Sequence, residues 1–111
     1  MKMDGQQVGT VEILTPIGAM VDEAAQDFAQ ALLARLKSAN PRVVLAMHEV
    51  PYLDSVALEG LVDAADALSA RAARLKLVHV NATCREVMEL TGVSERFIFF
   101  EDVQDAVRSF L

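Results

Sequence analysis

An aspartate and a serine, Asp54 and Ser55, stand where a run of apolar residues gives way to a helix-like pattern. A side chain at this place can cap the helix, because its oxygen accepts hydrogen bonds from the free backbone N–H groups of the first turn. The serine can also present an exposed hydroxyl for covalent modification. We expect Asp54 or Ser55 to act as the cap, and the elements around the pair indicate whether the hydroxyl has a second role.

Other reactive side chains are sparse in this sequence. The single cysteine, Cys84, cannot form an internal disulfide, and His48 and His79 do not have the spacing of zinc ligands. A serine hydrolase would need a Gly-x-Ser-x-Gly elbow and a histidine after the last strands, but Ser55 lacks both flanking glycines. We therefore expect no metal, no cofactor and no enzymatic activity, and we expect Cys84 to be a buried structural residue.

The composition is that of one acidic globular domain. The chain has 111 residues, of which 53% are hydrophobic, which is enough for a single core. A formal net charge of -6 disfavours nucleic-acid binding, and no cluster of Lys and Arg could follow a phosphate backbone. No signal-peptide pattern opens the chain, and no apolar run reaches the roughly 20 residues that span a bilayer. These features predict a cytoplasmic protein without membrane insertion.

Apolar periodicity predicts the elements that position the Asp-Ser pair. Residues 8–17 read as a strand near a sheet edge, because Pro16 closes it. Residues 18–41 place apolar side chains at helical spacing and stop at Asn40-Pro41. The apolar blocks 42–50 and 75–81 suit strands buried on both faces. Between these blocks lies a helix of roughly four turns, whose apolar face comprises Leu58, Leu61, Val62, Ala65 and Leu68.

The rest of the chain continues the same alternation. A helix with Gly92 as its C-cap precedes a short strand over 96–100 and a terminal helix over 101–111. The order predicts an α/β domain with a mostly parallel sheet of four to five strands and about four helices. Residues 2–8 can add an antiparallel N-terminal edge strand. In such a sheet, functional groups gather where strands lead into helices, as at Gly18, at Ser55 and at the capping residues Asn81 and Thr83.

This arrangement resembles the STAS family, the domain of bacterial anti-sigma-factor antagonists. The resemblance covers nearly all of residues 1–111 and implies one STAS domain over that range. Its most specific part is the apolar strand followed by Val50-Pro51, then Leu53-Asp54-Ser55 and Leu58. In the family, a cognate serine kinase that is itself the anti-sigma factor phosphorylates the serine directly after the aspartate. Ser55 occupies that place.

The mechanism that this resemblance implies is partner switching. The unmodified domain binds the kinase and so frees the sigma factor or another client, phosphorylation at Ser55 separates the complex, and a phosphatase resets the cycle. The expected contact surface combines the Asp-Ser turn with the turn around Gly18, and comprises Asp54, Ser55, Val56, Glu59, Gly18 and Asp22.

The residues after Ser55 keep an alternative open. The commonest family pattern continues with Ser-Gly or Thr-Gly, whereas this chain continues Val56-Ala57-Leu58-Glu59-Gly60, as in the stressosome-scaffold subgroup. The alternative is a constitutive STAS adaptor or scaffold, in a stressosome-like or lipid-transport complex, whose serine is never phosphorylated. A receiver domain is disfavoured, because the first strand is not followed by an acidic pair and no lysine follows Lys76.

The strand over 96–100 carries two adjacent aromatic residues, Phe99 and Phe100. Neighbouring side chains of a strand point to opposite faces, so we expect one of these rings to be partly exposed. An exposed ring could support a homodimer or a partner contact.

Overall fold

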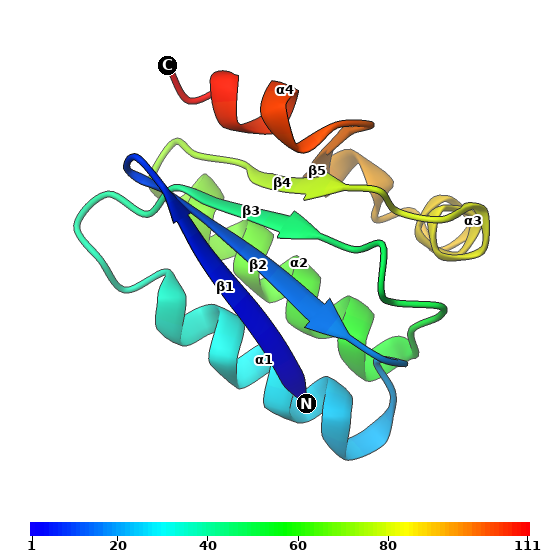
Figure 1. Ribbon diagram of the computed structural model, residues 1–111. Coiled ribbons are helices and arrows are strands. Elements are labelled where there is room, and N and C mark those ends of the chain that lie inside the picture. The colour runs from blue at the N-terminus through cyan, green and yellow to red at the C-terminus, as the bar shows by residue number, and fades with distance from the viewer.

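The computed structural model describes residues 1–111 as one α/β domain built on a five-stranded sheet in the order β1-β2-β3-β4-β5 (Figure 1). Strand β1 pairs antiparallel with β2, and every later pair is parallel. This confirms the predicted fold class and the antiparallel N-terminal edge strand. The strands are β1 (Lys2–Val8), β2 (Val11–Ile17), β3 (Val43–Ala46), β4 (Leu75–Val78) and β5 (Phe97–Phe100).

Helices cover both faces of the sheet. Helices α1 and α2 lie on one face, and α4 lies on the opposite face (Figure 1). None of the helices is both long enough and apolar enough to cross a membrane. The helices are α1 (Asp22–Arg35), α2 (Ser55–Ser69), α3 (Ala82–Leu90) and α4 (Val103–Arg108), with a single 3₁₀ turn, Ser94–Arg96, before β5.

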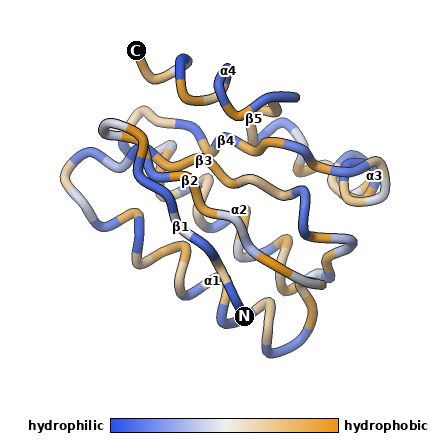
Figure 2. Tube along the Cα trace, in the orientation of Figure 1, coloured by the Kyte–Doolittle hydropathy of each residue, from blue (hydrophilic) through white to orange (hydrophobic).

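The sheet separates two hydrophobic cores of unequal size. The larger core, with 22 buried residues, lies mainly between the sheet and helices α1 and α2. The smaller core lies under α4, and the central strand β3 between the two cores is apolar throughout and drawn in orange shades in Figure 2. Phe99 packs against the larger core and Phe100 against the smaller one. Both rings are half-buried, whereas the sequence predicted partial exposure for one of them.

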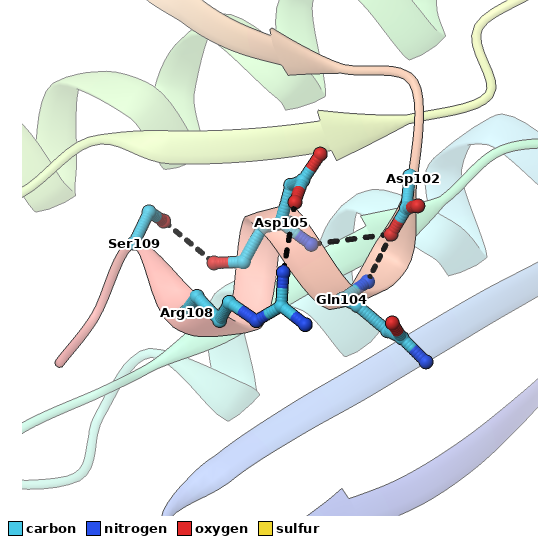
Figure 3. Close-up of polar contacts among 6 residues, drawn as sticks. Asp102, Gln104, Asp105, Arg108 and Ser109 are labelled. Atoms are coloured by element: carbon cyan, nitrogen blue, oxygen red, sulfur yellow. Dashed lines mark hydrogen bonds and ion pairs between the residues drawn. The ribbon is translucent and has the colours of Figure 1, made fainter.

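Several elements are shorter than their apolar patterns. Helix α1 ends at Arg35 rather than at Asn40-Pro41, because the N–H of Leu36 closes a tight turn onto Leu33 and Arg71 binds the free carbonyls beyond it. Strands β3 and β4 stop before residues 50 and 81, because the N–H of Val50 closes a turn onto Met47 and His79 adopts a left-handed φ of 58°. Helix α4 begins only at Val103, because the side chain of Asp102 caps it (Figure 3).

A glycine sets the spacing of α1 and α2. A Cβ added to Gly60 would lie 2.7 Å from the Cβ of Ala29, a distance that no packed side chain tolerates. The two helices therefore approach closely only because residue 60 has no side chain. The late glycine of the Val-Ala-Leu-Glu-Gly stretch is thus explained by helix packing.

Candidate functional site

The carboxylate of Asp54 joins the N-termini of two helices. Its Oδ1 accepts a hydrogen bond of 3.0 Å from the N–H of Ala57 in the first turn of α2. Its Oδ2 accepts one of 2.8 Å from the N–H of Asp22, the first residue of α1. Of the two residues predicted as caps, Asp54 carries the cap and Ser55 begins the helix.

The turn around Gly18 is fastened to the Asp-Ser turn by backbone hydrogen bonds. The N–H of Met20 donates to Tyr52, and the N–H of Asp54 donates back to Met20, each at 3.0 Å. Gly18 has a φ of 106°, in the left-handed region that favours glycine, and its N–H donates to the carbonyl of Glu49. The two turns that were predicted to form one contact surface therefore lie side by side.

Asp22 has an unusual backbone conformation at this junction. Its φ of 52° lies in the left-handed region, which aspartate tolerates better than most residues with a side chain. The hydrogen bond from its N–H to Asp54 holds it there. Asp22 was predicted as part of the contact surface, and the structure shows that its backbone N–H contacts Asp54 while its side chain is exposed.

Ser55 is displayed rather than buried. Its side chain is exposed at the first position of α2, and it does not carry the cap. Glu59 is exposed one turn later, and Val56 is half-buried. Val56 and Glu59 line a shallow groove of about 360 Å³ between α1 and α2. Each of the residues predicted for the contact surface therefore lies on the turns or on the first two turns of α2.

The loop before Ser55 is held from the other side by Asn81. Its Nδ2 donates to the carbonyls of Val50 and Pro51, at 3.1 and 3.0 Å, while its Oδ1 caps α3 through the N–H of Cys84 at 2.8 Å. Cys84 is buried against the same loop, as predicted, and burial raises the pKa of its thiol. The loop is thus fixed between α1 and α3.

The electrostatics of the site come from carboxylates. Hydrogen bonds from the backbone N–H of Asp22, and then from that of Ala57, lower the pKa of Asp54 below its ordinary value of 3.8. Asp54 is therefore ionised at neutral pH beside the exposed residues Asp22 and Glu59. No group of three His, Cys, Asp or Glu residues could hold a metal ion. The arrangement offers a hydroxyl on an acidic, rigid surface.

Two contacts of this site could not be predicted from the sequence. The capping pattern indicates Asn81 but not its bonds to the loop before Ser55, and no pattern signals the bond between the N–H of Asp22 and Asp54. Both contacts join residues about 30 positions apart. A capping signature reports only on the helix that follows it.

Comparison with known proteins gives a family and a fold. A family model described as "STAS domain" matches residues 2–106. An anti-sigma factor antagonist from Mycobacterium paratuberculosis is 22% identical with a TM-score of 0.82, over 97% of this chain and 92% of that one. The phosphorylated form of SpoIIAA, a Bacillus cell fate determinant, is 14% identical with a TM-score of 0.73, over 97% and 99% of the two chains.

A third solved structure is a variant of RsbS from Moorella thermoacetica. It is 13% identical with a TM-score of 0.79, over 98% of this chain and 94% of that one. No curated protein matches the sequence. At these identities the likeness to solved structures establishes the fold.

Proposed function

This chain belongs to the STAS domain family, and from that membership we propose that it acts as an anti-sigma-factor antagonist, a regulator that binds a serine kinase and is switched by phosphorylation at Ser55. The observation that carries the proposal is the position of Ser55. It is exposed on the first turn of α2, directly after the Asp54 cap. The similarity to the phosphorylated SpoIIAA structure supports this choice of chemistry.

The site can accept a phosphate without unfolding. The N-terminus of α2 carries free N–H groups and the positive end of the helix dipole, which both favour a bound anion. The clamp made by Asp54 uses backbone groups of α1 and α2 and leaves the Ser55 side chain in solvent. We therefore expect phosphorylation to leave the fold intact.

The effect of the phosphate falls on the partner instead. Phosphorylation adds about 1.5 to 2 negative charges and three strong hydrogen-bond acceptors. Asp54, Asp22 and Glu59 already make the surface negative, so a partner fitted to the neutral hydroxyl would face a dense anionic site. The contact surface that we propose comprises Asp54, Ser55, Val56, Glu59, Gly18 and Asp22, and a phosphatase would restore it.

Replacing Ser55 with a charged residue tests this switch. We expect Ser55→Asp to weaken binding of the cognate kinase by about 100-fold, because an uncompensated like charge at an interface costs several kcal/mol. The matched control is Ser69→Asp, which adds the same charge at the exposed far end of α2 and should bind normally. Binding is measured by calorimetry, and both variants should keep the thermal transition of the parent chain.

Equal binding by Ser55→Asp and the parent chain would contradict the switch. A constitutive STAS adaptor or scaffold would then be the better account, since such a protein does not need a neutral side chain at this position.

A further inference from the structure

A second site candidate lies at the opposite end of the sheet. Three cationic residues, Arg42, Arg74 and Lys76, line one cavity of about 340 Å³, together with Ile98, Ser109 and Phe110. Arg42 and Arg74 directly precede β3 and β4, and Ser109 and Phe110 follow α4. The residues that line the cavity include no Asp or Glu. It therefore concentrates positive charge in a chain whose net charge is -6.

Lys76 lines this cavity and is only 8% exposed. Its Nζ donates to the Oγ of Ser109 at 2.7 Å and lies 3.5 Å from the ring centroid of Phe110. The hydroxyl of Ser109 is oriented for this contact, because it donates its own proton to the carbonyl of Ala106 (Figure 3). Both partners of the ammonium group are neutral, and at least one of its three N–H donors is left over.

The arginines of the cavity also lack a carboxylate. Arg42 donates to the hydroxyl of Thr10 at 3.1 Å, and Arg74 donates to the carbonyl of Glu95 at 2.8 Å. Four of the other five arginines form ion pairs, namely Arg35 with Glu12, Arg85 with Glu89, Arg96 with Asp66 and Arg108 with Asp105, and the fifth, Arg71, donates to backbone carbonyls. Lys76 is the only buried charged side chain of the protein, and it lies in the cavity without a carboxylate partner.

Uncompensated positive charge of this kind has a physical cost. Buried cations are normally paired, because removing them from water without a counter-charge is unfavourable. Burial, and then the charge of Arg42, lower the pKa of Lys76. An anion in the cavity would offset both effects, since it would supply the missing counter-charge to buried Lys76 and to half-buried Arg42, while Arg74 is exposed and already solvated.

We propose that this cavity binds a small phosphomonoester, whose phosphate lies against Lys76, Arg42 and Arg74 and whose organic body packs on Ile98 and Phe110. A phosphate dianion fits this set better than a single carboxylate does, because it offers several oxygens to two guanidinium groups and one ammonium. The cavity volume lies at the small end of the range for ligand sites. The site is independent of Ser55, which lies at the other end of the sheet.

Titration with phenyl phosphate, followed by backbone amide shifts at constant ionic strength, tests the assignment. We expect saturable shifts at residues around Arg42, Lys76 and Ser109, and tighter binding of phenyl phosphate than of inorganic phosphate. Lys76→Met should weaken binding by about tenfold or more, as expected for a lost charge-assisted hydrogen bond. The control Lys2→Gln removes a charge at the distant end of β1 and should bind like the parent chain.

Three results would overturn the proposal. The first is a change in the amide shifts that rises linearly with phenyl phosphate and that sodium chloride reproduces, because such a change reflects ionic strength alone. The second is equal binding by Lys76→Met and the parent chain. The third is retention on phosphatidate vesicles with no response to phenyl phosphate, which would assign the cavity to a lipid headgroup. If Lys76→Met does not fold, the double variant Arg42→Gln/Arg74→Gln decides, because loss of saturable binding in it supports the site and retention contradicts it.

Discussion

Helices α1 and α2 are tied together at both ends of the sheet, by a carboxylate at one end and a guanidinium at the other. At the carboxyl end of the parallel strands, Asp54 accepts hydrogen bonds from the N–H groups of Asp22 and Ala57. At the amino end, Arg71 donates to the carbonyls of Leu36 and Ala39, just beyond the last turn of α1. The two clamps have opposite charge because the two ends of a helix have opposite polarity.

This difference extends to the surfaces around each clamp. The carboxyl end carries Asp22, Asp54 and Glu59 around Ser55, and the amino end carries Arg42, Arg74 and Lys76 around a cavity. A phosphate therefore has different consequences at the two ends. At Ser55 it adds to negative charge and would repel a partner, whereas at Lys76 it would supply the counter-charge that the cavity lacks.

The largest effect on stability should come from the helix spacing on which both clamps depend. Gly60→Ala is expected to lower the free energy of unfolding by about 2 kcal/mol, because an overpacking cost of about 3 kcal/mol against Ala29 is offset by roughly 1 kcal/mol of better helix propensity. Chemical denaturation measures this change in the free energy of unfolding. The control Gly5→Ala places its Cβ 3.7 Å from Leu14, an ordinary contact, and should show no loss. Equal stability of the two variants would mean that the helices can move apart freely.

Removing the cationic clamp should have a smaller effect. Arg71→Ala is expected to lower the free energy of unfolding by about 1 kcal/mol, since two hydrogen bonds to the end of α1 are lost. Arg108→Ala is the control, because Arg108 forms only an exposed ion pair with Asp105 and its loss should cost less than about 0.5 kcal/mol. Indistinguishable denaturation midpoints for the two variants would show that Arg71 does not hold the helices together.

The acidic clamp should differ from the cationic one in its pH dependence. Asp54→Asn keeps one hydrogen-bond acceptor in the side chain. We therefore expect it to lower the free energy of unfolding by less than Arg71→Ala does. Because the pKa of Asp54 is lower in the folded chain than its ordinary value of 3.8, the carboxylate stabilises the fold fully above that value and this contribution is lost as the pH falls through the folded pKa.

The measurement is thermal unfolding of the parent chain and of Asp54→Asn across pH. The difference in melting temperature between these two proteins should stay constant from about pH 5 to 8 and shrink below about pH 4. The loss of melting temperature in Arg71→Ala should not follow this titration. A difference between parent and Asp54→Asn that persists unchanged into acid would contradict the role of the charge.

Much of the fold could be predicted from the sequence, because local patterns determine it. The apolar blocks around Val44 and Leu77 and the amphipathic spacing of α2 predict the sheet and its helices. The ends of α1, β3 and β4 could not be predicted, since tertiary contacts such as those of Arg71 set them. Helix propensity depends on the local sequence only. It therefore does not indicate that a side chain from another element binds a backbone carbonyl at the end of a helix.

The candidate site divides in the same way. The Asp-Ser pair stands out because capping chemistry is local, and the structure places both residues at the start of α2. The role of Gly60 and the charge cluster around Lys76 were missed, because each brings together residues from separate elements. An isolated lysine in an apolar strand gives no indication that two arginines and the end of α4 surround it.

We propose that Ser55 accepts a phosphate from a cognate serine kinase. Incubation of the chain with that kinase and ATP, followed by intact mass measurement and fragment mapping, tests this proposal, with Ser55→Ala in parallel. We expect one phosphate per chain, on Ser55, with none on Ser55→Ala and with release of the phosphorylated chain from the kinase. Absence of any added phosphate, or an equal level on Ser55→Ala, would contradict it.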